Sequence, residues 1–93
     1  MSSRITERDL KGAIKTLNRI TGNPEANYRR EGDKLIANIG SYYLEMAYGG
    51  NKLVQIVNEG GGIREITHGF IPKRELYHQI WAYIKGIEDG KGE

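Results

Sequence analysis

The chain opens with apolar and polar residues arranged in the period of an α-helix. From residue 10 to residue 21, apolar side chains recur at spacings of three and four, and basic residues follow the same spacing on the opposite side. Thr6 is a good N-cap with Asp9 three residues later, and Gly22 supplies a left-handed end. The sequence therefore predicts a helix from about Glu7 to Thr21 that buries one face.

From residue 28 the period changes to two, which is typical of strands. Turn-forming residues at 31–33, 40–41 and 49–51 separate the alternating stretches 35–39, 42–48 and 52–58. The simplest arrangement is an antiparallel meander of three strands. A fourth short strand is predicted at 63–67.

The helical period returns in the last apolar pattern, at residues 72–87. Pro72 suits the first position of a helix, where its missing N–H costs nothing. The chain ends at 1–5 and 88–93 are expected to be flexible. Helix, three or four antiparallel strands and helix together predict an α+β fold with both helices on one face of the sheet.

Composition limits what this fold can do. The 93 residues suit a single domain, residues 1–93. Cysteine is absent, and the spacing of His68 and His78 matches no pair of metal ligands, so we expect no metal and no cofactor. No spacing of base and nucleophile emerges, which predicts that the protein is not an enzyme. Neither a signal peptide nor a membrane span is recognisable, and a cytoplasmic protein without membrane contact is expected.

Three consecutive glycines occur in NEGGGIREIT, residues 58–67. A phosphate-binding loop places its glycines between a strand and the start of a helix. Here a strand-like pattern follows the glycines, and neither common phosphate-loop motif is matched. The glycines are therefore predicted to turn the chain between strands, and the alternative is a surface loop that touches a ligand or partner.

Positive charge is concentrated in the first helix, although the net charge of the whole chain is only +2. Residues 1–22 hold five basic residues against two acidic ones. Four of the basic residues form a ridge opposite the apolar face: Arg8, Lys11, Lys15 and Arg19. This basic ridge is either a solvated face or a contact surface for an acidic protein groove or a phosphate backbone.

A second candidate surface surrounds the start of the second helix. Lys73 and Arg74 occupy its first turn, where the helix dipole disfavours cations, so an anion or acidic partner there would relieve the repulsion. On the helical wheel Arg74, His78, Trp81 and Lys85 fall away from the centre of the apolar stripe. A partly exposed tryptophan among basic residues is a common interaction anchor, and the alternative is that Trp81 covers the margin of the core.

Tyrosine supplies a third candidate. If the helices cover one face of the sheet, the other face carries Tyr43 with Ile36, Asn38, Glu45 and the residues Val54 and Ile56. Such a face is too apolar to remain in water. We therefore expect it to pair with a second copy in a homodimer or to dock onto another protein.

The stretches AYGGNKLVQIVNEGGGIRE (47–65) and PKRELYHQIWAYIKGI (72–87), with LNRITGN at the end of the first helix, resemble small accessory proteins of tailed bacteriophages and prophages. The resemblance covers most of the chain. It implies a viral protein in the cytoplasm of a host bacterium that binds and modulates or inhibits a host protein. Defence nucleases, including CRISPR effectors, are among the targets that such anti-defence inhibitors bind.

The order of the elements is similar to that of double-stranded-RNA-binding domains, in which lysines begin the second helix. Lys73 and Arg74 stand at the matching positions. The chain lacks the Ala-rich second helix and the longer basic cluster of that family. The resemblance implies a nucleic-acid-binding module as the alternative function, and a structural component of the virion is a third possibility.

Overall fold

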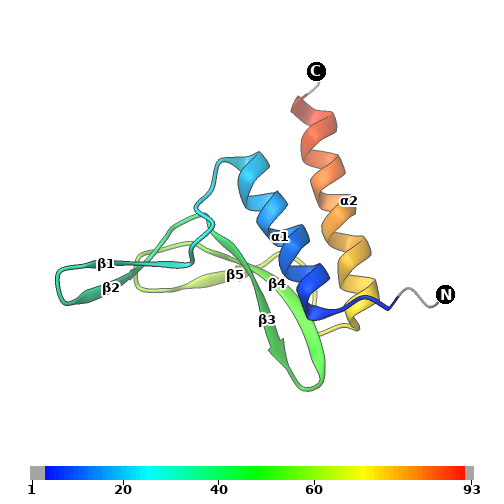
Figure 1. Ribbon diagram of the computed structural model, residues 1–93, viewed down its shortest axis with the longest axis horizontal. Helices are drawn as coiled ribbons and strands as arrows, with labels where there is room; N and C mark the ends of the chain where they lie inside the picture. The colour runs from blue at the N-terminus through cyan, green and yellow to red at the C-terminus, as the bar shows by residue number, and fades with distance from the viewer. Residues whose placement is uncertain (1–3, 92–93) are drawn as a thin grey trace.

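The computed structural model describes residues 4–91, which form two helices and two small antiparallel sheets (Figure 1). In chain order the elements are α1 (Glu7–Thr21), β1 (Tyr28–Glu31), β2 (Lys34–Ala37), β3 (Tyr42–Ala47), β4 (Gly50–Ile56), β5 (Ile63–Glu65) and α2 (Lys73–Lys91). The predicted α+β order of helix, antiparallel strands and helix is confirmed.

α1 has the predicted bounds because both of its ends are capped locally. The Asp9 N–H donates to the Thr6 hydroxyl at 3.2 Å, and the Thr6 N–H donates to the Asp9 carboxylate at 2.9 Å. This reciprocal pair satisfies two backbone donors that the helix itself leaves unpaired. Gly22 ends α1 with a φ of 73°, which a residue without a Cβ adopts at little cost.

α2 begins one residue later than predicted, and the Pro72 carbonyl accepts a hydrogen bond from the Leu76 N–H at 3.0 Å. Residues 88–91, expected to be a flexible end, continue the helix. At the other predicted end, Arg4 is exposed and Ile5 packs against the core. Residues 1–3 and 92–93 lie outside the described part of the chain.

The larger sheet is a meander of β3, β4 and β5, with Val54 of β4 opposite Tyr43 on one side and Glu65 on the other. β3 and β4 are joined by a tight turn in which Tyr48 and Gly49 both have positive φ, 53° and 73°. Two consecutive left-handed residues match the twist of a two-residue hairpin. The predicted strand at 63–67 is present in shortened form.

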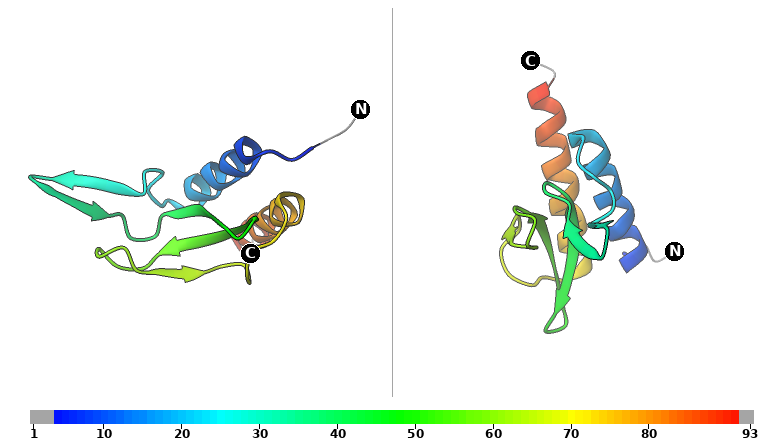
Figure 2. Two further views of the ribbon diagram at one scale, coloured as in Figure 1. Left: turned by 90° about the horizontal axis from the view of Figure 1, so that it is seen from below. Right: turned by 90° about the vertical axis from the view of Figure 1, so that its left-hand side faces the viewer.

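The chain before residue 40 does not extend this meander as predicted. β2 pairs with β1 instead, with Ala37 opposite Tyr28, and forms a separate hairpin. The hairpin of β1 and β2, called the arm below, projects from the rest of the molecule (Figures 1 and 2). The break occurs where the Gly40 N–H donates to the Ile56 carbonyl and the Ser41 N–H donates to the Asn38 carbonyl, because these bonds turn the chain between β2 and β3.

Both helices lie on one side of the larger sheet and run in the same direction beside each other (Figures 1 and 2). Between the helices and the sheet lies a single cluster of buried side chains. Its members are Leu10, Ala13, Ile14, Leu17, Tyr42, Leu53, Leu76, Ile80 and Ile84. Burial of this apolar surface is the main source of stability in a domain without disulfides.

The opposite face of the sheet is closed, so the predicted open apolar face is wrong. Val54 and Ile56 are 0% and 1% exposed, and Asn38 is buried as well. The chain covers this face itself: the Lys52 ammonium lies between the carboxylates of Glu45 and Glu65, at 3.3 and 2.6 Å, and 4.3 Å from the centre of the Phe70 ring. The physical reason given for a homodimer is therefore removed.

Candidate functional site

The basic ridge of α1 is exposed along its whole length, as predicted. Its two middle residues also make ion pairs. The Lys11 ammonium lies 2.8 Å from Glu7, one turn earlier, and the Lys15 ammonium lies 3.6 Å from Glu25, in the connection that follows α1. Exposed pairs of this kind contribute little to stability because solvent screens them, so an incoming carboxylate exchanges with them at little cost.

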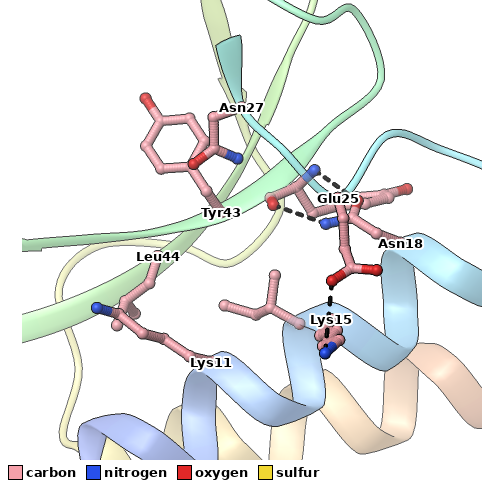
Figure 3. A pocket seen from close by; sticks show the side chains of 9 residues that line it. Lys11, Lys15, Asn18, Glu25, Asn27, Tyr43 and Leu44 are labelled. Carbon is pink, nitrogen blue, oxygen red and sulfur yellow. Dashed lines mark hydrogen bonds and ion pairs between the residues drawn. The ribbon is translucent and has the colours of Figure 1, made fainter. Parts of the chain in front are cut away.

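Lys11 and Lys15 border a hollow of about 420 Å³ between α1 and β3 (Figure 3). The hollow, called the α1–β3 groove below, is lined by Lys11, Ile14, Lys15, Asn18, Glu25, Asn27, Tyr42, Tyr43 and Leu44. The two ammonium groups stand on the helix side, and Tyr43 and Leu44 stand on the strand side. Lys11 and Lys15 of the basic ridge thus border the α1–β3 groove as well as bulk solvent.

Tyr43 lies opposite Val54, so its side chain is on the face of the sheet away from the helices, as predicted, but it is half-buried there; the residue also borders the α1–β3 groove at the edge of β3. Burial raises the pKa of its phenol above the ordinary value, with smaller contributions from Tyr28 and Glu45. The phenol is therefore neutral near physiological pH, when it is a hydrogen-bond donor as well as an acceptor. The groove thus has two cations on its helix side, and the Tyr43 ring lies beyond β3 from them (Figure 3).

Asn18 lies at the back of the groove and is 2% exposed. Its amide nitrogen donates to the Tyr42 carbonyl at 3.1 Å, and its amide oxygen accepts from the Tyr42 N–H at 2.8 Å. One side chain thus satisfies both backbone groups of an edge-strand residue, as a neighbouring strand does. Sequence reasoning missed this residue, although an asparagine beside the apolar stripe of α1 was a usable signal because asparagine is a poor choice in a helix interior.

A partly buried polar contact joins β3 to α2. The hydroxyl oxygens of Tyr42 and Tyr83 lie 3.2 Å apart, and the two rings meet edge to face with centroids 6.0 Å apart. Burial raises the pKa of Tyr42 to about 12, and the hydrogen bond with Tyr83 adds to the effect. Tyr42 therefore stays protonated at neutral pH and acts as a structural link rather than as an acid or base.

The candidate residues of α2 separate into two places. Lys73 borders a hollow of about 290 Å³ with Met46, Ala47 and the β3–β4 turn. The hydrogen bond from Lys11 lowers the pKa of Glu7, and the charge of Lys73 lowers it further. Lys73 therefore lies near the first turn of α1. Together with Lys11 and Lys15 it is one of three basic residues that lie beside β3.

Trp81 and Lys85 line neither hollow. Trp81 is 40% exposed, and its ring lies edge to face with Tyr77 at 6.3 Å between centroids. Lys85 lies 3.7 Å from Asp89 in an exposed pair, and Arg74 is exposed near the start of the helix. The predicted surface of Arg74, Trp81 and Lys85 is thus present on α2 but is separate from the α1–β3 groove.

The triple-glycine segment is a turn between β4 and β5, as predicted. The Asn58 side-chain oxygen accepts from the Gly62 N–H at 2.9 Å, and the Val57 N–H donates to the Gly62 carbonyl at 2.8 Å. Gly61 has a φ of 93°, a conformation that side chains with a Cβ rarely adopt. A strand follows, so no helix N-terminus converges on the glycines.

The same turn also holds the base of the arm, a role that sequence reasoning missed. The Ala37 N–H donates to the Glu59 carbonyl at 3.2 Å, and the Arg29 guanidinium donates to the Glu59 carboxylate at 3.0 Å. A Cβ added at Gly61 would stand 3.6 Å from the Tyr28 hydroxyl. The glycines thus allow a compact turn against which the arm docks.

We expect Gly61→Ala to lower the free energy of unfolding by about 1–2 kcal/mol, because alanine is strained at this φ. Gly12→Ala is the matched control. Gly12 is exposed within α1, and an added Cβ there meets no atom within 4 Å, so this change should raise stability by about 0.5–1 kcal/mol. Urea unfolding followed by circular dichroism measures both, and equal effects of the two changes would contradict the turn geometry.

Two further features bear on the kind of site. Within residues 4–91, no group of three or more histidine and acidic side chains is placed to hold a metal ion. Neither α1 nor α2 combines the length and the apolar character that crossing a membrane requires. Comparison of the chain with protein-family models, with curated proteins and with solved structures finds no match.

Proposed function

We propose that the protein is a non-enzymatic binding domain that recognises an acidic surface of another protein. The observation that carries this proposal is the α1–β3 groove, in which two exposed lysines of α1, Lys11 and Lys15, border the edge of β3. Cations beside the apolar side chains of Ile14 and Leu44 suit a partner surface that presents carboxylates. The resemblance to phage accessory proteins implies that the partner is a host protein, which binding would modulate or inhibit.

The electrostatics of the groove support an acidic partner. Of its charged lining residues, two are basic and one, Glu25, is acidic. Arg8 and Arg19 extend the positive surface along α1, and Lys73 continues it beside the end of β3. Complementary charge of this kind accelerates encounter and selects among partners more than it adds affinity.

The surface of Arg74, Trp81 and Lys85 is a second contact region for the same partner or for another. A half-exposed tryptophan buries a large area when a partner covers it, and tryptophan and arginine are enriched among residues that dominate binding energy. Because this surface is separate from the groove, its contribution is measurable on its own. Arg74→Glu/Trp81→Ala is the variant that removes it.

Nucleic-acid binding is the second candidate function, supported by the exposed Lys73 and Arg74 at the start of α2 and by the basic ridge. The separate arm departs from the continuous sheet of double-stranded-RNA-binding domains. A salt titration with duplex RNA and duplex DNA discriminates between the functions, because binding driven by phosphate contacts weakens steeply as salt rises. Absence of binding to either duplex at low salt would eliminate this candidate.

We expect Lys11→Glu/Lys15→Glu to weaken binding to a protein partner by about 10- to 100-fold, because both attractive contacts become repulsive. Affinity capture from host lysate with the wild-type protein supplies the partner, and isothermal titration calorimetry then gives the dissociation constants. Arg30→Glu/Lys34→Glu is the matched control, since it makes the same change in charge on the exposed arm. Equal losses in the two variants would show that the groove is not the binding site.

A further inference from the structure

β3 is an edge strand, because among residues 4–91 β4 is its only neighbour in the sheet. Backbone groups of an antiparallel strand face its two sides in alternation. The Ser41 carbonyl accepts from the Ile56 N–H, so residues 41, 43 and 45 turn their backbone groups toward β4. The N–H and C=O groups of Tyr42, Leu44 and Met46 therefore face outward, which agrees with the bonds from Asn18 to Tyr42.

Only the first of these three outward-facing residues is paired. Asn18 takes both backbone groups of Tyr42, whereas within residues 4–91 the outward backbone groups of Leu44 and Met46 make no hydrogen bond. Met46 is 49% exposed. An open edge of this kind is a template for an additional strand, whose backbone bonds supply affinity while its side chains supply specificity.

Positive charge lies beside this open edge. The Lys11 side chain extends from α1 toward Leu44, and Lys15 is one helical turn further along (Figure 3). A carboxylate already occupies the groove: Glu25 reaches Lys15 at 3.6 Å. Lys73 stands at the other end, beside Met46. An extended chain laid along β3 would therefore pass three ammonium groups.

We propose that the edge of β3 from Leu44 to Met46 receives an extended acidic segment of the partner as an added strand, and that carboxylates of this segment pair with Lys11 and Lys15. This inference rests on the proposed function and specifies how the partner binds. Backbone bonds to Leu44 and Met46 continue the pattern that Asn18 begins at Tyr42. Alternate side chains of the added strand point to the helix side, where the ammonium groups are.

A second copy of this chain is a poorer occupant of the same edge. Two copies would pair their β3 strands about a two-fold axis, each copy using the backbone groups of Leu44 and Met46. This pairing places Glu45 of one copy directly opposite Glu45 of the other. Like charges directly opposite on neighbouring strands are destabilising. Such pairing also brings two copies of Lys11 and Lys15 toward each other. The charges of the edge thus favour an acidic segment over a homodimer.

The test uses Met46→Pro in the full chain. Proline removes the outward N–H, and because this N–H does not bond to β4, the hairpin of β3 and β4 keeps its own hydrogen bonds. The probe is a fluorescent eight-residue peptide of alternating glutamate and valine, titrated at low salt. Met46→Val is the control, since it changes the same side chain and keeps the donor. Circular dichroism verifies that both variants are folded.

We expect the peptide to bind the wild type, with the amide signals of Leu44 and Met46 shifting and gaining protection from hydrogen exchange. Met46→Pro should weaken this binding roughly five- to tenfold, about the effect of one lost hydrogen bond, whereas Met46→Val should change it less than twofold. A peptide with lysine in place of glutamate should not bind. Absence of binding by the glutamate peptide, or equal binding by Met46→Pro and the wild type, would overturn the proposal.

The captured partner separates this inference from the proposed function. If Lys11→Glu/Lys15→Glu abolishes its binding while Met46→Pro leaves it intact, the groove binds an acidic surface but strand addition is overturned. If neither variant affects the partner, the groove is not the binding site, and strand addition is overturned with it. Self-association of the wild type that Met46→Pro abolishes, measured by sedimentation velocity, would assign the edge to a second copy and would also overturn strand addition.

Discussion

Leu53→Ala should lower the free energy of unfolding by about 2–5 kcal/mol, the range for truncating a fully buried leucine. Leu53 is 0% exposed and lies in the central strand β4, among the side chains that α1 and α2 bring to the sheet. Its removal leaves a cavity among side chains of α1, α2 and β3. A small domain has a total stability of only about 5–15 kcal/mol, so the loss is a large fraction of the whole.

Met46→Ala is the control for this truncation, since Met46 lies in the neighbouring strand but is half-exposed. Its effect should remain below about 1 kcal/mol. Urea unfolding monitored by the far-ultraviolet circular dichroism signal measures both variants. Equal losses at the two positions would contradict the placement of the core on the helix side of β4.

Asn18→Leu should lower the free energy of unfolding by about 2–4 kcal/mol, although leucine has nearly the same size and is more apolar. The change leaves the N–H and the C=O of Tyr42 buried without their partner, and each unsatisfied group costs about 1–3 kcal/mol. The Tyr42 amide should also lose protection from hydrogen exchange. Nuclear magnetic resonance measures this local effect separately from the global loss of stability.

Arg19→Leu places the same side chain on the exposed side of α1 and should change stability by less than about 0.5 kcal/mol. If Asn18→Leu instead stabilised the domain, burial of the leucine would outweigh the two lost hydrogen bonds. The claim that Asn18 substitutes for a neighbouring strand would then be wrong. Because Asn18 also lines the α1–β3 groove, any measurement of partner binding with this variant must be corrected for its folded fraction.

Local signals were sufficient to predict the helices and the β3–β4 hairpin. The capping box at Thr6 and Asp9 and the left-handed Gly22 involve neighbouring residues, so their geometry follows from a short stretch of chain. The exposure of Lys11 and Lys15 follows equally from helical periodicity. Their role in binding remains a prediction.

The arrangement of the strands was not predictable from alternation. A period of two shows which residues share a face, but it does not show which strand lies beside which. Asn38 helps to pair β2 with β1 rather than with β3. Its N–H donates to the Asn27 carbonyl and its side chain donates to the Ala26 carbonyl. These two hydrogen bonds hold the end of β2 against the chain before β1. These partners are 11 and 12 residues away, so no local pattern indicates them.

The sequence by itself determined where the helices begin and end, which of their sides are apolar, and that the glycines at 60–62 turn the chain, because each depends on bonds and spacings within a few residues. Only the tertiary structure decided that Lys52 and Phe70 cover part of the second face of the sheet, and that Lys11 and Lys15 border an open strand edge. Those features depend on contacts between segments far apart in the chain. Packing of the whole core positions such segments, and no stretch of sequence specifies it alone.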